Sequence, residues 1–228
     1  MLTLRTIRRH TLTIACLFTA APFASPVPAQ TFTSHGAFFG VAGTPSYTET
    51  FESVPVPKNT PVPSFSQAGI TYLGQAGIPY PNVYVSAPGF VGYAPGLTPT
   101  TTSILTANGD EDFFIQFLNP HHAVGFDVYY NGLGPLTSSF FNGTTLLASI
   151  TYNGPAILGF NGYVSSAGAP VTSIRFVSTA GAAIDAGLDN LAVIDAPVST
   201  TPEPATLSLL ATGIVGLMIV RRRRGAAE

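Results

Sequence analysis

Apolar and polar positions alternate in short segments along the middle of the chain, and Gly, Pro and Asn separate these segments. In residues 172–178, TSIRFVS, the apolar Ile174 and Phe176 alternate with Ser173 and Arg175, as expected for a strand with one buried face. Similar β-branched and aromatic segments bounded by turn residues predict further strands. We expect strands near residues 47–52, 69–73, 82–86, 112–118, 122–130, 138–142, 144–151, 157–164, 171–178 and 188–195. No segment shows the period of an amphipathic helix.

The turns between these segments indicate an antiparallel arrangement. Asn-Gly pairs, which favour tight hairpin turns, occur at residues 108–109, 131–132, 142–143, 153–154 and 161–162. Many short strands at this spacing predict an all-β domain over residues 30–195, a two-sheet antiparallel jelly-roll sandwich. The Pro-rich stretch of residues 53–67 is predicted to be an extended excursion on the surface of this domain.

Charge is scarce and unevenly placed along the chain. Charged residues make up 9% of it, far below the roughly 25% of an average globular protein. Between residues 30 and 200 the only basic residues are Lys58 and Arg175, against nine acids, which gives this part a formal charge of −7. A nucleic-acid-binding surface needs many cations to neutralise phosphates, so we exclude that class. An acidic body is compatible with divalent cations or neutral glycans.

Residues 1–29 have the layout of a secretory signal peptide. Three arginines lie within the first nine residues, and an apolar stretch, residues 12–23, is followed by small residues. We expect cleavage after Ala29, with Ala24 as the alternative. The sole cysteine, Cys16, lies inside this segment, so the mature protein is expected to have neither a disulfide nor thiol chemistry.

The C-terminus shows three features in a fixed order. A linker, residues 196–204, contains Pro-Glu-Pro, an apolar run follows at residues 205–220, and a basic tail occupies residues 221–228. As a helix the run would span about 24 Å, against about 30 Å of bilayer hydrocarbon, and flanking arginines can snorkel to the interface. We therefore predict a transmembrane sorting helix whose basic tail stays cytoplasmic.

This order resembles the PEP-CTERM sorting signal of Gram-negative bacteria. The residues that carry the resemblance are Pro202, Glu203, Pro204, Arg221, Arg222, Arg223 and Arg224. The resemblance implies processing at or near Pro-Glu-Pro by an exosortase, a membrane-embedded cysteine transpeptidase. It also implies a precursor anchored transiently in the inner membrane, and then a protein at the cell surface or in the exopolysaccharide matrix of a biofilm. An ordinary C-terminal tail anchor is the alternative.

The body resembles lectin-like sandwiches and carbohydrate-binding modules over residues 45–195. The segments that carry this resemblance are the strand with Phe51-Glu52, residues 123–129 (AVGFDVY) and residues 187–193 (GLDNLAV). Such a resemblance implies a fold more than a function. In many jelly-roll modules the first and last strands are neighbours, and a Glu from one and an Asp from the other bind a structural calcium ion.

On this pattern Glu52 and Asp189 are the candidate calcium ligands. Calcium takes six to eight oxygen ligands, so backbone carbonyls and other acids would have to complete the shell. The alternative is that both carboxylates simply face solvent. A bound ion would stabilise a domain that has no disulfide, and calcium is the only cofactor that we predict.

Other candidate sites have less support in the sequence. His121 and His122 are adjacent in a predicted strand, so their side chains point to opposite faces and cannot jointly grip a zinc ion. Four tyrosines in or beside the Pro-rich loops could stack on sugar rings or pack against the rim of the sandwich. They are Tyr72, Tyr80, Tyr84 and Tyr93. No hydrolase or nucleotide-binding motif occurs, and we predict no catalytic residue.

The sequence therefore predicts an exported, non-enzymatic β-sandwich that associates with exopolysaccharide as a structural component. The alternative is a lectin-like module with a defined sugar site, and a secreted hydrolase is a third reading of the same features.

Overall fold

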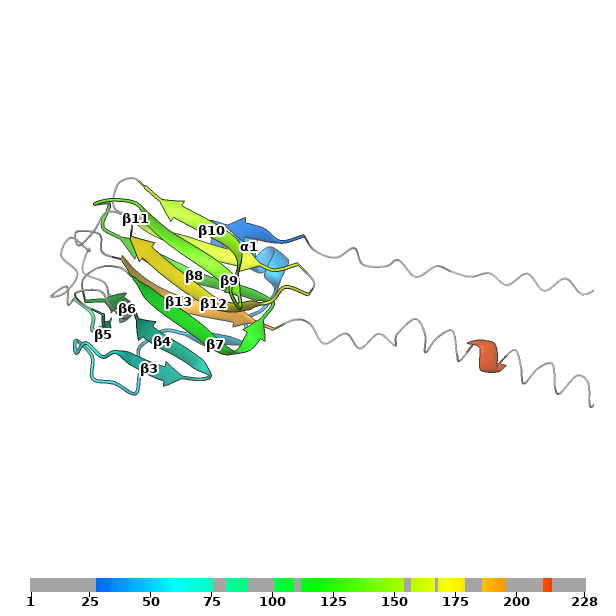
Figure 1. Cartoon of the computed structure of the whole chain (residues 1–228), viewed down its shortest axis with the longest axis horizontal. Helices are drawn as coiled ribbons and strands as arrows, with labels where there is room; N and C mark the ends of the chain where they lie inside the picture. Colours follow the sequence, from blue (N-terminus) through cyan, green and yellow to red (C-terminus); the bar gives the residue numbers. More distant parts are fainter. Residues whose placement is uncertain are drawn as a thin grey trace, which may run out of the picture.

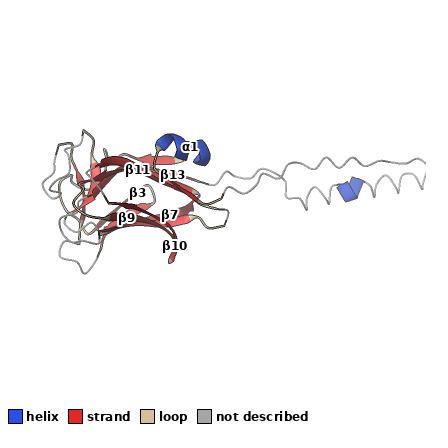
Figure 2. Cartoon of the chain, turned by 90° about the horizontal axis from the view of Figure 1, so that it is seen from above, coloured by secondary structure: helices blue, strands red, loops and turns tan. Residues whose placement is uncertain are grey.

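The computed structural model describes residues 28–75, 81–89, 101–108, 112–153, 157–166, 168–178, 186–195 and 211–214. The described chain from residue 30 to residue 194 folds into two antiparallel β-sheets that pack face to face (Figure 1). Helix α1 (His35–Ala42) lies on the outer side of one of them (Figure 2). The predicted all-β, two-sheet sandwich is confirmed.

Seven strands form the first sheet, called sheet 1 here. Its order is β1-β11-β8-β13-β6-β5, and β2 also pairs with β13. The bounds are β1 (Gln30–Phe32), β2 (Tyr47–Glu49), β5 (Val83–Ser86), β6 (Ile104–Ala107), β8 (Ala123–Tyr130), β11 (Ile157–Val164) and β13 (Ala186–Ile194).

Six strands form the second sheet, called sheet 2, in the order β10-β9-β12-β7-β4-β3. The bounds are β3 (Ser64–Gln67), β4 (Ile70–Gly74), β7 (Phe113–His121), β9 (Leu136–Asn142), β10 (Thr145–Tyr152) and β12 (Val171–Ser178). All ten predicted strands overlap strands of the structure, whereas β1, β3 and β6 were not predicted. These three are only three or four residues long, too short to show a clear alternation.

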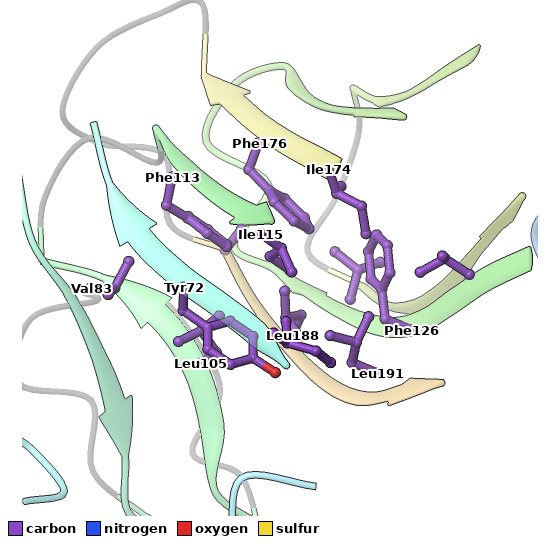
Figure 3. Packing of buried hydrophobic residues seen from close by; sticks show 14 of the residues in the cluster. Tyr72, Val83, Leu105, Phe113, Ile115, Phe126, Ile174, Phe176, Leu188 and Leu191 are labelled. Atoms are coloured by element: carbon purple, nitrogen blue, oxygen red, sulfur yellow. The ribbon is translucent and has the colours of Figure 1, made fainter. Parts of the chain in front are cut away.

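The hydrophobic core fills the space between the two sheets. In β7 the side chains of Phe113 and Ile115 are fully buried, and Phe176 of β12 is buried beside them. The rings of Phe113 and Phe176 stack with their centroids 4.4 Å apart. Phe126 and Leu188 meet this cluster from sheet 1 (Figure 3). Because side chains alternate between faces, this burial fixes the register of both sheets.

Helix α1 was not predicted, because its segment lacks the period of an amphipathic helix. Its sequence, HGAFFGVA, has two glycines and is apolar on all sides, and no side chain caps its first turn. The helix is held by Phe38, which is fully buried. A Cβ atom on Gly125 or Gly162 would come within 2.8 Å or 2.6 Å of this ring. The two glycines of sheet 1 thus make room for Phe38, which no local pattern reveals.

The Pro-rich stretch of residues 53–67, predicted as an extended surface excursion, is mostly exposed or half-buried but is not all loop. Its last four residues form β3, and Val62 forms an isolated bridge with Val83. Val54 and Val56 pack against the core. Bends and a turn at residues 58–59 interrupt this stretch, so it is not one extended segment, and the valines between its prolines turn toward the sandwich.

Most of the predicted terminal segments lie outside the described residues, namely residues 1–27, 196–210 and 215–228. The seven residues of the sorting motif belong to these segments. Residues 211–214, within the predicted sorting helix, are helical. None of the described helices is long and apolar enough to cross a membrane.

Candidate functional site

Glu52 and Asp189 come together where β2 ends and β6 begins, since both strands pair with β13. The Glu52 carboxylate accepts hydrogen bonds from the backbone N–H of Ser103 at 2.8 Å and from its hydroxyl at 2.9 Å. Asp189 accepts a hydrogen bond from the hydroxyl of Thr102 at 2.8 Å. The first predicted strand, residues 47–52, does lie beside the last, because β2 pairs with β13, although Glu52 follows β2 and the first strand of the structure, β1, pairs with β11.

A second carboxylate lies directly opposite Asp189, that of Asp127 on β8. Asp189 is 1% exposed, and burial raises its pKa, with the charges of Asp127 and Glu52 adding to the rise. Asp127 is paired with the imidazole of His35 at 2.7 Å and accepts a hydrogen bond from the Asn190 amide at 2.7 Å. This acidic network therefore ties α1 to the outer face of sheet 1.

The cation nearest to the predicted calcium ligands is a lysine. The Lys58 ammonium donates to Glu52 at 3.2 Å and to the Ser103 hydroxyl at 2.6 Å. Hydrogen bonds from Ser103, with a smaller effect of Lys58, hold the pKa of Glu52 below its ordinary value. Among the described residues, no three or more His, Cys, Asp or Glu side chains gather closely enough to hold a metal ion. Calcium binding by Glu52 and Asp189 stays a prediction.

The two adjacent histidines make separate contacts, but they do not share a strand: His121 ends β7, and His122 lies in the bend before β8. Nδ1 of His121 lies 2.8 Å from a carboxylate oxygen of Asp195. Nδ1 of His122 lies 3.3 Å from the hydroxyl of Ser165. The hydrogen bond with His121 holds the pKa of Asp195 below its ordinary value.

Two of the four tyrosines considered for sugar stacking are inside the protein. Tyr72 and Tyr84 are fully buried, so a role in stacking on a ligand is wrong for both. The Tyr72 ring stacks on Phe65 within the core, with the centroids 4.8 Å apart. Tyr80 and Tyr93 lie outside the described residues.

The outer face of sheet 2 carries nearly neutral side chains in straight transverse rows. The strand register defines two rows that cross all six strands. One row is Ser64, Leu73, Phe114, Arg175, Ser139 and Ser149, and the other is Ser66, Thr71, Gln116, Ser173, Phe141 and Leu146. We call these two rows the hydroxyl face. Hydroxyl pairs join neighbouring strands, with 2.9 Å between Ser139 and Ser149 and 2.8 Å between Ser66 and Thr71.

Arg175 is the one charged residue of the hydroxyl face, and its guanidinium is held from several sides. It lies over the ring of Phe114, 5.2 Å from the centroid, and donates to the side-chain oxygen of Gln75 at 2.8 Å. The Asp112 carboxylate is 3.9 Å away and offsets the charge. The Arg175 side chain is 37% exposed. A guanidinium has five N–H donors, so this one can offer further donors to a ligand.

Sequence reasoning did not single out the hydroxyl face as a site. The alternation in residues 172–178 did predict that the side chains of Arg175 and the buried Phe176 lie on opposite faces of the strand, and the structure confirms this. The partners of Arg175 come from segments up to 100 residues away in the chain. Strand pairing brings these partners to Arg175, and no local sequence motif indicates the arrangement.

The sandwich is similar to several solved structures. One is the K2 cleaved adhesin domain of Lys-gingipain, with 15% identity, 64% of this chain and 98% of that chain covered, and a TM-score of 0.46. Another is the CBM22-1 xylan-binding domain from Paenibacillus barcinonensis Xyn10C, with 13% identity, 68% and 98% covered, and a TM-score of 0.37. A family 29 carbohydrate-binding module has 11% identity, 79% and 99% covered, and a TM-score of 0.28. No curated protein matches this chain.

The C-terminal segment gives the other match. Residues 200–224 match the model of the PEP-CTERM protein-sorting motif. The matched range contains the Pro-Glu-Pro of residues 202–204, the apolar run and all four arginines of residues 221–224. The resemblance predicted for this segment is confirmed, and it indicates that the chain is exported with a membrane-anchored sorting signal.

Proposed function

We propose that this protein is an exported, non-enzymatic surface or matrix protein of a Gram-negative bacterium, and that its sandwich associates with a neutral exopolysaccharide. The sorting motif at residues 200–224 supports the export. The observation that carries the glycan part is the hydroxyl face of sheet 2. It offers hydroxyl and amide groups in rows across six strands, and Arg175 is its only charged residue.

The chemistry of this face matches that of neutral sugars. Sugar hydroxyls both donate and accept hydrogen bonds, as do the hydroxyls of Ser and Thr and the amide of Gln. Phe114 and Phe141 are partly exposed in the two rows and supply apolar surface for the faces of sugar rings. Because the body has a formal charge of −7, long-range repulsion disfavours polyanions, which favours a neutral polymer.

The carboxylate pair of Asp127 and Asp189 lacks the setting of a hydrolytic pair. A glycosidase needs two carboxylates that flank the scissile bond. Here Asp189 is 1% exposed and Asp127 is held by His35, so the pair is closed to a polymer. A secreted hydrolase would release reducing ends from the bound polysaccharide, and we expect none.

Binding is tested with the purified chain in a detergent without a sugar headgroup, by co-sedimentation with the exopolysaccharide of the host. We expect weak, multivalent binding that falls about tenfold or more in the Phe114→Ala, Arg175→Gln double variant, as for contacts central to an interface. The control is Leu158→Ala, because Leu158 is 67% exposed and faces outward from sheet 1. Equal binding by both variants would contradict a role of the hydroxyl face. Saturation by one small sugar would favour the lectin-like alternative.

Processing by an exosortase is tested separately. We expect the mature protein in the surface or matrix fraction to end at or near Pro202–Pro204. An intact mass from that fraction that still includes Arg221–Arg224 would favour the ordinary tail anchor instead.

We also propose that calcium binds at Glu52 and Asp189. The two carboxylates contact the adjacent residues Thr102 and Ser103, and a divalent cation would relieve the repulsion at the buried Asp189. The ion would take the place of Lys58 on Glu52, with hydroxyl and carbonyl oxygens completing its shell.

A further inference from the structure

One long part of the chain contains no acidic or basic side chain. Residues 128–174 contain no Asp, Glu, Lys, Arg or His. This part includes β9, β10 and β11. In the structure β10 and β9 are the last two strands of sheet 2, and β11 lies beside the edge strand β1 of sheet 1. β1 is also uncharged and lies next to β10. The uncharged segments therefore form one side of the sandwich, which we call the neutral flank.

The edge of the neutral flank is strand β10. Its eight residues, TLLASITY, contain no charge, proline or glycine. In the part of the chain that the structure describes, β10 pairs with β9 and with no other strand. Natural proteins protect edge strands by making them short or by placing charges or prolines on them. The edges at β1, β3 and β5 are only three or four residues long, whereas β10 has eight residues and a single protective feature, a bulge between Leu146 and Ala148.

The geometry of β10 suits pairing with another strand. A bulge disturbs its pairing with β9 between Leu146 and Ala148, but from Ala148 to Tyr152 the register is regular. An edge strand leaves every second N–H and C=O pointing outward. A polysaccharide cannot complete such a ladder of amide groups, and a β-strand can. Leu146 is 55% exposed on this strand and adds apolar surface.

We propose that the occupant of this edge is a second copy of the same chain, through antiparallel pairing of β10 with β10 of that copy. An antiparallel pair of identical strands has two-fold symmetry, the commonest symmetry of homodimers. The charge distribution also favours contact at the neutral flank. Two bodies of charge −7 repel each other, and this repulsion is smallest where the two copies meet through surfaces that carry no acidic side chains. The joined sheets would continue the hydroxyl face across both copies.

The chain offers a matched pair of variants for the test. Ser149 on β10 and Ser66 on β3 are both exposed, both lie on edge strands at opposite ends of sheet 2, and both hydrogen-bond to a hydroxyl on the next strand. Lysine at either position changes the net charge equally. Only lysine at position 149 would place like charges across the proposed interface.

The experiment measures the mass of the full-length chain in a non-ionic detergent by sedimentation over a range of concentrations. We expect dimers for the wild type and for Ser66→Lys, and a dimer dissociation constant about tenfold or more higher for Ser149→Lys. Thermal unfolding checks that both variants are folded, and Thr151→Lys, exposed on the same strand, repeats the test. A monomeric wild type, or equal masses of the Ser149 and Ser66 variants, would overturn the proposal.

Disulfide trapping gives an independent readout. In a full-length chain with Cys16→Ser, we expect Ser149→Cys or Thr151→Cys to form a covalent dimer on mild oxidation, while Ser66→Cys stays monomeric. Equal cross-linking at Ser66 would show random collision and would also overturn the proposal.

Discussion

Helix α1 covers part of the outer face of sheet 1, beside β11 and β1, and the carboxylates of that face are tied to partners, whereas the outer face of sheet 2 presents rows of mostly neutral side chains. On sheet 1, Asp127 is bound by His35 of α1 and Asp189 is buried. On sheet 2, Arg175 is the single charge in two rows of six residues, and Asp112 offsets it.

The two outer faces therefore differ in what covers them. Sheet 1 has Gly125 and Gly162 side by side, and the missing side chains leave space that Phe38 fills. That face is consequently used for stability. On sheet 2 most of the outward residues in the two rows are polar and can be hydrated, and Leu73, Phe114, Phe141 and Leu146 leave apolar surface between them. The comparison is sharpened by changes on sheet 1 that should alter stability without altering binding.

The largest effect is expected from Phe38→Ala. Phe38 is fully buried between α1 and sheet 1, and removing a buried Phe side chain typically costs about 3–5 kcal/mol. We expect chemical denaturation to show this loss of unfolding free energy, with glycan binding unchanged where the protein remains folded. A loss below about 1 kcal/mol would mean that α1 contributes little to the fold.

The control for this change lies in the same helix. A Cβ atom on Gly40 would meet nothing within 4 Å, so Gly40→Ala should stabilise α1 by about 0.5–1 kcal/mol through its lower backbone entropy when unfolded. Denaturation curves of the two variants should therefore shift in opposite directions.

A smaller effect is expected from Asp189→Asn. The pKa of Asp189 is raised in the folded state, so its ionisation opposes folding, and that cost develops as the pH rises from the unfolded pKa to the folded one. With chelator at neutral pH we expect the variant to be about 0.5–1 kcal/mol more stable than the wild type, the range for cross-strand charge pairs. The difference should vanish in acid.

Calcium gives this variant a second use. If the ion binds at Glu52 and Asp189, excess calcium should raise the melting temperature of the wild type but not that of Asp189→Asn. An unchanged wild-type melting temperature between calcium and chelator would contradict the calcium site and leave the charge argument intact.

The smallest effect concerns Asp195, at the end of β13. The hydrogen bond with His121 lowers the pKa of Asp195, so the contact stabilises the fold above the unfolded pKa and is lost as the pH falls through the lowered folded pKa. Because Asp195 is 62% exposed, we expect only about 0.2–0.5 kcal/mol. Stability measured against pH should lose this step in Asp195→Asn. If the wild type and Asp195→Asn lost the same stability over the same pH range, the loss would come from another carboxylate.

Much of the fold was predictable because the burial pattern is local. Strands β8, β11 and β12 are eight-residue segments rich in β-branched or aromatic residues, and the structure has them within a residue of the predicted bounds. The helix α1 was not predictable, since its stability comes from two glycines about 90 and 125 residues further along the chain. The candidate site was likewise predictable only in part. Glu52 and Asp189 were identified as candidate ligands from the sequence, but their contacts with Thr102, Ser103 and Lys58 were not predicted.

The sequence by itself determined the sorting signal, the all-β class and the long uncharged stretch of residues 128–174, because each is a property of consecutive residues. Only the tertiary structure decided that this stretch forms one side of the sandwich with β10 at its edge, and that Arg175 meets Phe114, Gln75 and Asp112 on the outer face of sheet 2. The physical reason is that strand order and register are set by the packing of two apolar faces against each other, and this packing joins residues that are far apart in the chain.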